Sequence, residues 1–357
     1  MVKGNAKTVL FRLLLAVLLC SGPSALFAAE RPEAQASRDP FSNLSPGSFL
    51  LPGAAADVPA VPQAVPVAQP DGVQVTLAKG LDVFFISVGQ GDAEYIQLPN
   101  GKNVLIDTGP KGAKDAPAPP VADFLKAHGI SKLDYLVLTH PHADHYGGMR
   151  YVLDNIQVGT FIDTRIDNSE AKEDDTLRQR VAQMGLPTRY PRAGETLDWG
   201  AGVAADVLNS CPDPMVSADY GKLSGQTVNN CSIVIRLGYQ GASILFTGDA
   251  QEQVEAELVS KYGDRLRSDI LKVGHHGSLY SSSAAFLAKV QPKMAYIEVG
   301  RNTYGHPTTA ALSRLEAAGA AIFRTDRDGT QEYVSNGPLP NRPAAKSAAQ
   351  TAFLTWP

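Results

Sequence analysis

Hydrophobic and polar residues alternate in short blocks along most of this sequence, and a regular pattern of apolar runs begins near residue 75. From there on, short apolar runs end in polar or glycine-containing turns, as buried strands do. Between several of these runs, apolar residues recur at the spacing of amphipathic helices. Alternating strands and helices predict an α/β domain.

The individual elements follow from the same patterns. Asn100-Gly101 predicts a hairpin turn, Gly129 predicts the end of the first helix, and residues 210–230 are polar and predict a loop. The apolar runs predict strands at 81–88, 93–98, 103–106, 135–138, 232–237, 243–246, 269–273 and 295–298, with shorter strands after 157, near 194 and 200, and before 334. The amphipathic stretches predict helices that end at 128 and that span 146–154, 169–184, 250–261, 282–290 and 308–318.

The first 29 residues have the pattern of a secretory signal peptide. Basic residues precede the apolar run 13–19, and a helix-breaking turn and small residues follow it up to Ala29. The run is several residues too short for a transmembrane anchor, and an uncleaved interfacial helix is the other alternative. We therefore expect cleavage near Ala28 or Ala29, and a periplasmic or secreted protein without a stable membrane anchor.

Two further segments differ in composition from the α/β region. Residues 30–74 are rich in proline and alanine and nearly free of periodic apolar spacing, so they are expected to form a disordered linker. This segment is either a tether or simply a disordered mature N-terminus. Residues 336–357 are expected to be a flexible tail, which leaves residues 75–335 as the folded domain.

Composition and charge narrow the class of protein. The chain has 357 residues, of which 44% are hydrophobic, as in ordinary globular proteins. Loss of residues 1–29 would remove three basic and no acidic residues, leaving 29 basic and 36 acidic residues and a net charge of −7. No basic stripe is visible, which argues against a general polyanion-binding surface. Cys211 and Cys231 would remain after cleavage, and an oxidising compartment favours a disulfide between them.

The sequence from Thr139 to Gly148 carries the clearest chemical signal. Three imidazoles and a carboxylate occupy six positions directly after the apolar run 135–138, in the order His140, His142, Asp144 and His145. Borderline divalent ions such as zinc take imidazole nitrogen and carboxylate oxygen, and a turn after a strand can direct these side chains at one volume. The fixed spacing favours a metal site over a histidine-rich surface loop.

The other candidate residues also lie where predicted strands end. Asp249 follows the strand 243–246 and would be either a ligand or the N-cap of the helix 250–261. His275 and His276 follow the strand 269–273. His306 precedes a helix and would be a ligand, a proton donor facing a phosphate, or a capping residue, of which the proton donor is favoured.

Two carboxylates, Asp92 and Asp107, lie in loops that leave the first predicted strands. A ligating imidazole usually donates its second ring N–H to a carboxylate or a carbonyl, so both are candidates for that outer role. The alternative is that they stabilise turns through Asx hydrogen bonds.

Taken together, these motifs resemble the metallo-β-lactamase-fold hydrolases, and most of all the hydrolase domain attached to bacterial competence DNA-uptake channels (ComEC type). The resemblance extends from about residue 81 to residue 334. It rests on six motifs in the same order, which are 88–93, the histidine-rich segment, Asn229-Asn230-x-Ser232, Thr247-Gly248-Asp249, 275–278 and 304–307. It implies an αββα four-layer sandwich, in keeping with the two β-rich halves of the sequence.

The resemblance also implies roles for the candidate residues. Asp144, His145 and His276 would hold one ion and His140 and His142 the other, with Asp249 between them. Asp144 would also belong to the catalytic residues, and His306 or His275 would protonate the leaving oxygen. The ions would be one or two Zn²⁺, with Mn²⁺ as an alternative.

The sequence departs from the family pattern at one position. Many relatives have a further histidine between the first motif and the bridging carboxylate, but this sequence has none between His145 and Asp249. The missing ligand at the first site would be Asn230, a water, or Cys231 if that cysteine is not in a disulfide. The site could also hold one ion firmly and the other weakly.

These features predict an exported hydrolase that cleaves phosphodiester bonds, in nucleic acid or a smaller substrate, with a metal-activated hydroxide. The alternative within enzymes is hydrolysis of β-lactams or other amides and esters. Against it, Asp249 stands where lactamase branches have cysteine, and the third histidine is missing. A second alternative is a non-catalytic metal-binding module.

Overall fold

The structure is a computed structural model, and it describes residues 80–114, 116, 118–168, 172–211 and 224–335. All described residues belong to one compact unit, Val73–Pro357. The predicted signal peptide, the linker and the tail therefore lie outside the described residues. Within the described residues, no helix is long and apolar enough to span a membrane.

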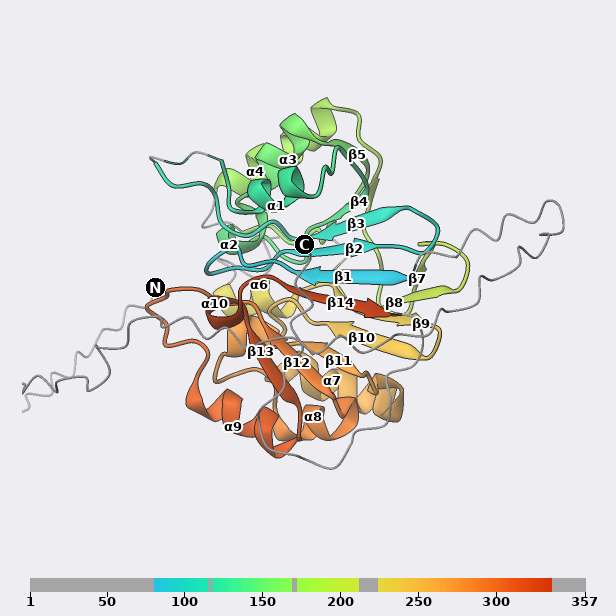
Figure 1. Ribbon diagram of the computed structural model, residues 1–357, viewed down its shortest axis with the longest axis vertical. Coiled ribbons are helices and arrows are strands. Elements are labelled where there is room, and N and C mark those ends of the chain that lie inside the picture. The colour runs from blue at the N-terminus through green and yellow to red at the C-terminus, as the bar shows by residue number, and fades with distance from the viewer. Residues whose placement is uncertain (1–79, 115, 117, 169–171, 212–223, 336–357) are drawn as a thin grey trace, which may run out of the picture. The chain divides into compact units, whose positions relative to one another are not determined.

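The described residues form two seven-stranded mixed sheets (Figure 1). The first has the order β14-β1-β2-β3-β4-β5-β6 and the second the order β13-β12-β11-β10-β9-β8-β7. The strands of the first sheet are β1 (Leu81–Phe85), β2 (Glu94–Gln97), β3 (Asn103–Ile106), β4 (Lys132–Val137), β5 (Gln157–Ile162), β6 (Thr188–Arg189) and β14 (Gln331–Ser335). Those of the second are β7 (Thr196–Leu197), β8 (Val203–Asn209), β9 (Val234–Tyr239), β10 (Ala242–Phe246), β11 (Ile270–Lys272), β12 (Met294–Ile297) and β13 (Ala321–Arg324).

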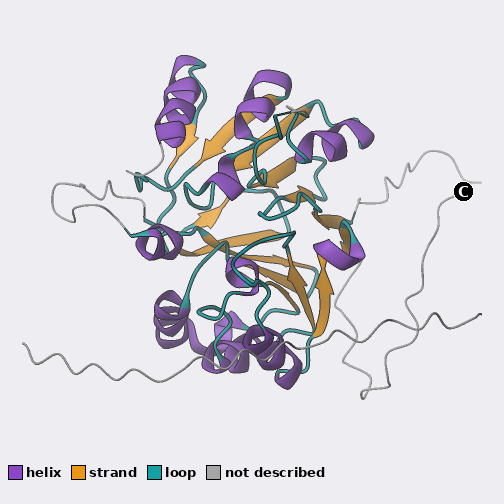
Figure 2. Ribbon diagram, turned by 90° about the vertical axis from the view of Figure 1, so that its left-hand side faces the viewer, coloured by secondary structure: helices purple, strands orange, loops and turns teal. Residues whose placement is uncertain are grey.

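Helices cover the outer faces of both sheets, while the inner faces pack on each other (Figure 2). The helices are α1 (Val121–Ala127), α2 (Ala143–Tyr146), α3 (Met149–Asn155), α4 (Lys172–Gln183), α6 (Gly225–Asn230), α7 (Glu252–Tyr262), α8 (Ala284–Val290), α9 (Thr309–Ala317) and α10 (Thr325–Asp328), with short 3₁₀ turns η1 (Gly263–Leu266) and η2 (Gly274–Gly277). Apolar side chains of α1, α3 and α4 pack on the first sheet, and those of α7, α8 and α9 pack on the second. This confirms the predicted αββα sandwich.

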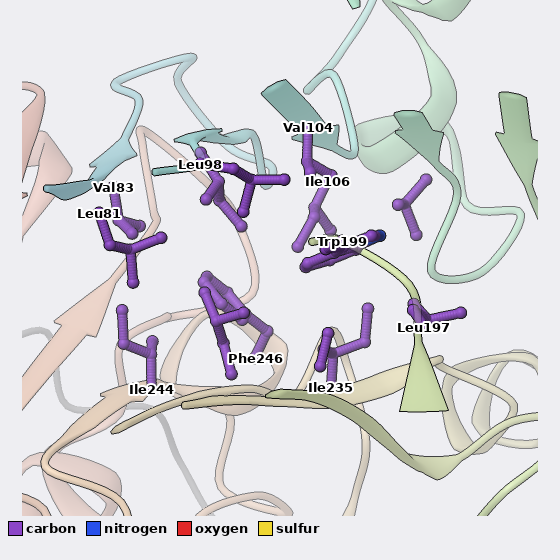
Figure 3. Close-up of a cluster of buried hydrophobic side chains, with 14 of the residues drawn as sticks. Leu81, Val83, Leu98, Val104, Ile106, Leu197, Trp199, Ile235, Ile244 and Phe246 are labelled. Atoms are coloured by element: carbon purple, nitrogen blue, oxygen red, sulfur yellow. The ribbon is translucent and has the colours of Figure 1, made fainter. Parts of the chain in front are cut away.

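The core between the sheets explains the apolar runs of the sequence. Alternate residues of β1 are fully buried and face the other sheet, as the pattern in Figure 3 shows for Leu81 and Val83. The ring of Phe85 stacks on that of Tyr296 across the interface, with centroids 4.1 Å apart. Strand β10 is buried along its whole length because helices cover its other face. Each fully buried large side chain contributes about 1.5–3 kcal/mol to folding.

The chain order of the strands differs from a simple division into two β-rich halves. The last strand, β14, pairs antiparallel with β1 in the first sheet. The sequence predicts two short strands near residues 194 and 200; the observed strands are the short β7 and the seven-residue β8, which pair with each other in the second sheet. Long-range pairing of this kind leaves no mark on local periodicity, so the pattern could not predict it.

The predicted loop 210–230 is wrong at its end, where α6 forms. Ser224 is the N-cap of this helix, and its hydroxyl accepts a hydrogen bond from the N–H of Thr227 at 3.2 Å. The predicted helix 146–154 is in fact two, because α2 starts at Ala143 and Gly147 and Gly148 separate it from α3. The histidine-rich segment therefore continues into a helix of its own.

Cys211 and Cys231 are joined by a disulfide, with Cα atoms 5.0 Å apart. The cysteines are 20 positions apart in sequence, and cross-linking a loop of this size removes about 3 kcal/mol of chain entropy from the unfolded state. We predict that a reducing agent lowers the free energy of unfolding by about that amount, measured by denaturant titration. A Cys211→Ser/Cys231→Ser variant should not respond to the reductant, and two free thiols in denatured protein lacking residues 1–29 would contradict the prediction.

Candidate metal centre

Parallel strands from both sheets deliver their carboxyl ends to one edge of the sandwich. Asp107 follows β3 and the histidine-rich segment follows β4, and these two strands are parallel. On the other sheet, β10, β11 and β12 are parallel and lead to Asp249, the His275-His276 pair and Glu298 respectively. Because ligands bind beyond the carboxyl ends of such strands, this edge is where a site is expected.

Close backbone packing joins the two loops of the first sheet. Gly91 has φ +144°, and a Cβ there would lie 2.2 Å from the carbonyl oxygen of Asp144, so no other residue fits. The N–H of Asp92 instead donates to that oxygen at 3.2 Å. Gly91 thus allows the backbone at Asp92 to pack against the histidine-rich segment.

Three of the predicted imidazole ligands surround one carboxylate oxygen of Asp249. Asp249 Oδ2 lies 3.4 Å from His145 Nε2 and 3.7 Å from the Nε2 atoms of His140 and His276. Two ligands about 2.1 Å from a tetrahedral ion lie roughly 3.4 Å apart, so these distances suit ligands that share ions. The ligand atoms form two sets within 4.8 Å, which are His140, His142 and Asp249, and Asp144, His145 and His276. The family resemblance implies the same division of these histidines and Asp144 between two ions.

Several buried ligand atoms in these sets have no hydrogen-bond partner. They are His145 Nε2, His276 Nε2 and Asp249 Oδ1. A buried polar atom without a partner costs free energy unless something else satisfies it. Imidazole nitrogen with carboxylate oxygen is the donor set that zinc and related ions take. The residues present therefore fit a divalent cation.

Burial and neighbouring carboxylates shift the pKa values of the histidines at this centre. Burial favours the neutral ring of His145, but Asp249, Asp107 and Asp92 outweigh it and hold its pKa well above the ordinary value. The pKa of His276 is likewise raised by Asp249 and Asp92 against the effect of burial. Burial lowers the pKa of His140 well below the ordinary value. Metal binding would therefore displace protons from His145 and His276.

The second ring nitrogen of each central histidine has an outer partner. His145 Nδ1 bonds to Asp107 Oδ2 at 2.7 Å, and His276 Nδ1 donates to the carbonyl of Glu298 at 2.8 Å with Asp92 Oδ1 at 3.1 Å. These bonds leave Nε2 of both rings to face the centre. Asp107 and Asp92 thus contact the Nδ1 atoms of His145 and His276, which is the supporting role expected for both.

We predict that Asp107→Asn lowers the affinity for divalent metal by about 10–100-fold. The neutral amide would replace the carboxylate that accepts the hydrogen bond from His145 Nδ1 and orients this ring. The Thr139 N–H and hydroxyl that bond to Asp107 should keep the new side chain in place. Competition with a chelator of known affinity measures the effect. Asp123→Asn, on the exposed face of α1, is the matched control, and equal affinities for both variants would contradict the prediction.

Residues that the sequence interpretation missed lie just below the ligands. Lys272 is fully buried, and its ammonium bonds to Asp92 and lies 3.2 Å from the carbonyl of Gly248. Glu94 and Glu298 are buried beside Asp92, and burial, followed by the Asp92 charge, raises the pKa of Glu298 to about 8. The signal was present, because Lys272 interrupts an apolar strand and Glu298 follows one, as the ligands do.

A cavity of about 390 Å³ opens above the ligands. His275 and His306 line it, with ring centroids 5.2 Å apart, and so does the exposed ring of Tyr304. Burial, followed by His275 and His276, lowers the pKa of His306 to about 4. A second cavity of about 440 Å³, near Arg236 and Tyr262, contains none of the predicted ligands. The chemistry therefore belongs to the first cavity.

Comparison with known proteins agrees with this fold. Residues 86–210 match the Metallo-beta-lactamase superfamily. The two-sheet sandwich, with its candidate ligands at the strand ends, has the metallo-β-lactamase fold.

Among curated proteins, the chain is similar to ComE operon protein 3 of Bacillus subtilis, with 32% identity over 267 residues, or 71% of this chain and 33% of that protein. It is also similar to competence protein ComA of Neisseria gonorrhoeae, with 33% identity over 250 residues, or 69% of this chain and 31% of that protein. The chain thus spans about a third of the length of these relatives. It contains a metallo-β-lactamase superfamily domain related to those of competence proteins, which confirms the predicted resemblance.

Among solved structures, the diiron β-hydroxylase CmlA of Streptomyces venezuelae matches with a TM-score of 0.49 and 14% identity, covering 72% of this chain and 54% of that one. A diphosphatase of the PhnP family matches with a TM-score of 0.41 and 16% identity, covering 72% of this chain and 99% of that one.

Proposed function

We propose that the protein is an exported metal-dependent phosphodiesterase or nuclease. The observation that carries the proposal is the position of Asp249 Oδ2, which lies within 3.7 Å of imidazole nitrogens from both ligand sets at the floor of an open cavity. A carboxylate shared between two sets is suited to two ions a few ångströms apart, the arrangement that phosphatases and nucleases use. The competence proteins among its relatives fit a function related to nucleic acid, which supports nucleic acid as the substrate.

The six candidate ligands would hold two ions. His140, His142 and Asp249 would hold one ion, and Asp144, His145 and His276 the other. When bound, such ions supply Lewis acidity toward a phosphoryl oxygen and lower the pKa of a water molecule. Zinc fits the imidazole-rich donors best, and the carboxylates Asp144 and Asp249 also suit manganese.

His306 is the proposed proton donor to the leaving oxygen. Its Nδ1 is buried without a hydrogen-bond partner, and its ring borders the cavity. The side chain of Asn302 fixes the loop, because its Oδ1 accepts from the N–H of His306 at 3.1 Å and its Nδ2 donates to the His306 carbonyl at 2.8 Å. The negative charge of a bound phosphate would raise the pKa of His306 toward the range in which it carries a proton.

Export is supported by the signal-peptide pattern of residues 1–29 and by the disulfide between Cys211 and Cys231. Cleavage would release the domain from the membrane. The mass of the protein recovered from a periplasmic or culture fraction tests this, since an intact N-terminus in the cytoplasm would refute it.

A substrate panel tests the activity. The metal-replete protein is offered a chromogenic phosphodiester, DNA and a β-lactam, with a chelator-treated sample as the control. Hydrolysis of a phosphodiester or DNA, lost with the chelator and restored by zinc or manganese, is the expected result. Hydrolysis of the β-lactam alone would establish the alternative enzyme, and inactivity of fully loaded protein on all three would favour a non-catalytic module.

A further inference from the structure

We infer that His275 is the fourth ligand of the first metal site and takes the place of the histidine that the sequence lacks. The set of His140, His142 and Asp249 supplies three ligand atoms, whereas zinc in proteins is normally four-coordinate. This inference concerns metal binding and does not depend on the substrate.

The position of the His275 ring is the first observation. Its Nε2 lies 3.7 Å from Asp249 Oδ2, the same distance as the Nε2 atoms of His140 and His276. The side chain is 22% exposed and lines the cavity together with His142. His275 thus approaches the shared oxygen from the open side of the centre.

The backbone of η2 is the second observation. His275 has φ 48° and ψ 48°, and His276 has φ 52° and ψ 27°, so two consecutive histidines adopt the left-handed conformation. Such residues cost about 1–3 kcal/mol each and persist where the surroundings enforce them. Here the His275 N–H donates to the carbonyl of Gly248, and the N–H of Thr308 donates to that of Gly277. The turn presents both rings to Asp249 instead of only one.

The outer partner of His275 is the third observation. The side-chain Nε2 of Gln251 lies 3.2 Å from His275 Nδ1, and Gln251 is buried. A 180° rotation of this amide would place its oxygen there, where it would accept from Nδ1–H and leave Nε2 with a free lone pair for an ion. A ligating histidine usually has such a partner.

The other nearby side chains that could supply the missing ligand are engaged elsewhere. Cys231 is in the disulfide. The amide of Asn230 donates to Gln253 at 2.9 Å and accepts from the Gln251 N–H at 3.1 Å. Ser232 Oγ accepts from the Asp249 N–H at 3.0 Å.

Asn229 is the remaining rival. Its Oδ1 is buried without a partner, and its Nδ2 is 3.5 Å from His275 Nε2. An amide oxygen is a poorer zinc ligand than an imidazole, so His275 is the better assignment.

The test measures metal binding in the purified protein by zinc stoichiometry and chelator competition. His275→Gly adopts the positive φ without cost, and His275→Asn tolerates it well, so both variants preserve the turn. Each variant should lose the zinc of the first site or bind it less tightly. The loss of affinity should exceed the ~10–100-fold that follows when a residue that only supports a ligand is removed. The zinc held by Asp144, His145 and His276 should remain.

Two matched variants complete the test. His306→Ala removes an imidazole from the same cavity and should leave stoichiometry unchanged, whereas Asn229→Ala removes the rival. Cobalt in place of zinc gives ligand-field absorption that depends on the ligand set, and His275→Gly should change it. Wild-type stoichiometry, affinity and cobalt spectrum in both His275 variants would overturn the inference, and so would loss of a zinc in Asn229→Ala alone.

Discussion

Replacing Asp249 by alanine is expected to abolish the binding of at least one ion and to reduce hydrolysis by about 10³-fold or more. The loss of an ion removes several kcal/mol of transition-state stabilisation, and each 1.36 kcal/mol is a factor of ten in rate. Asp249 has this weight because its Oδ2 lies within 3.7 Å of imidazole nitrogens from both ligand sets. Metal analysis of the purified variant, together with its rate on the best substrate of the panel, measures both effects.

The structure separates this effect from a loss of folding. The sequence left open that Asp249 is a helix N-cap, but α7 begins at Glu252 and its N-cap is Gln251. The helix therefore does not depend on the Asp249 carboxylate. Asp264→Ala is the control, because that exposed carboxylate pairs with the exposed ammonium of Lys289. An Asp249→Ala protein with two bound ions and normal rates would refute the role of Asp249.

The metal centre was predictable from sequence where ligands follow a repeated local pattern. His140, Asp249 and His276 each come directly after an apolar strand, and parallel strands bring such positions to one edge. Periodicity identified the strands, and fixed spacing identified the histidine-rich segment. The ends of elements shifted by a few residues because caps such as Ser224 act through a single hydrogen bond.

What the sequence could not supply depends on distant contacts. Lys272 reads as an isolated charge in a strand until Asp92, 180 positions away, is seen beside it. The pairing of β14 with β1 and the engagement of Asn230 by Gln253 have the same character. Local patterns carry no information on such partners, so the environment below and beside the ligands emerged only from the structure.

Lys272→Met is expected to lower the free energy of unfolding of the metal-free protein by about 3–5 kcal/mol, the usual result of removing one partner of a buried ion pair. The ammonium is fully buried against Asp92 and the Gly248 carbonyl. Burial opposes its charge, but Asp92, Asp249 and Glu94 raise the pKa of Lys272 above the ordinary value, so it is a cation in the folded state. Denaturant titration in the presence of a chelator measures the change.

Two comparisons isolate the buried charge. Lys289→Met breaks the exposed pair with Asp264, in which the Asp264 side chain is 92% exposed, and should cost at most about 1 kcal/mol. In Lys272→Met/Asp92→Asn the unpaired carboxylate is also gone, so part of the lost stability should return, whereas independent sites would give additive losses. A Lys272→Met variant no less stable than Lys289→Met would mean that solvent or a proton already compensates Asp92. The contact of Lys272, in the second sheet, with Asp92, in a loop of the first, would then not stabilise the fold.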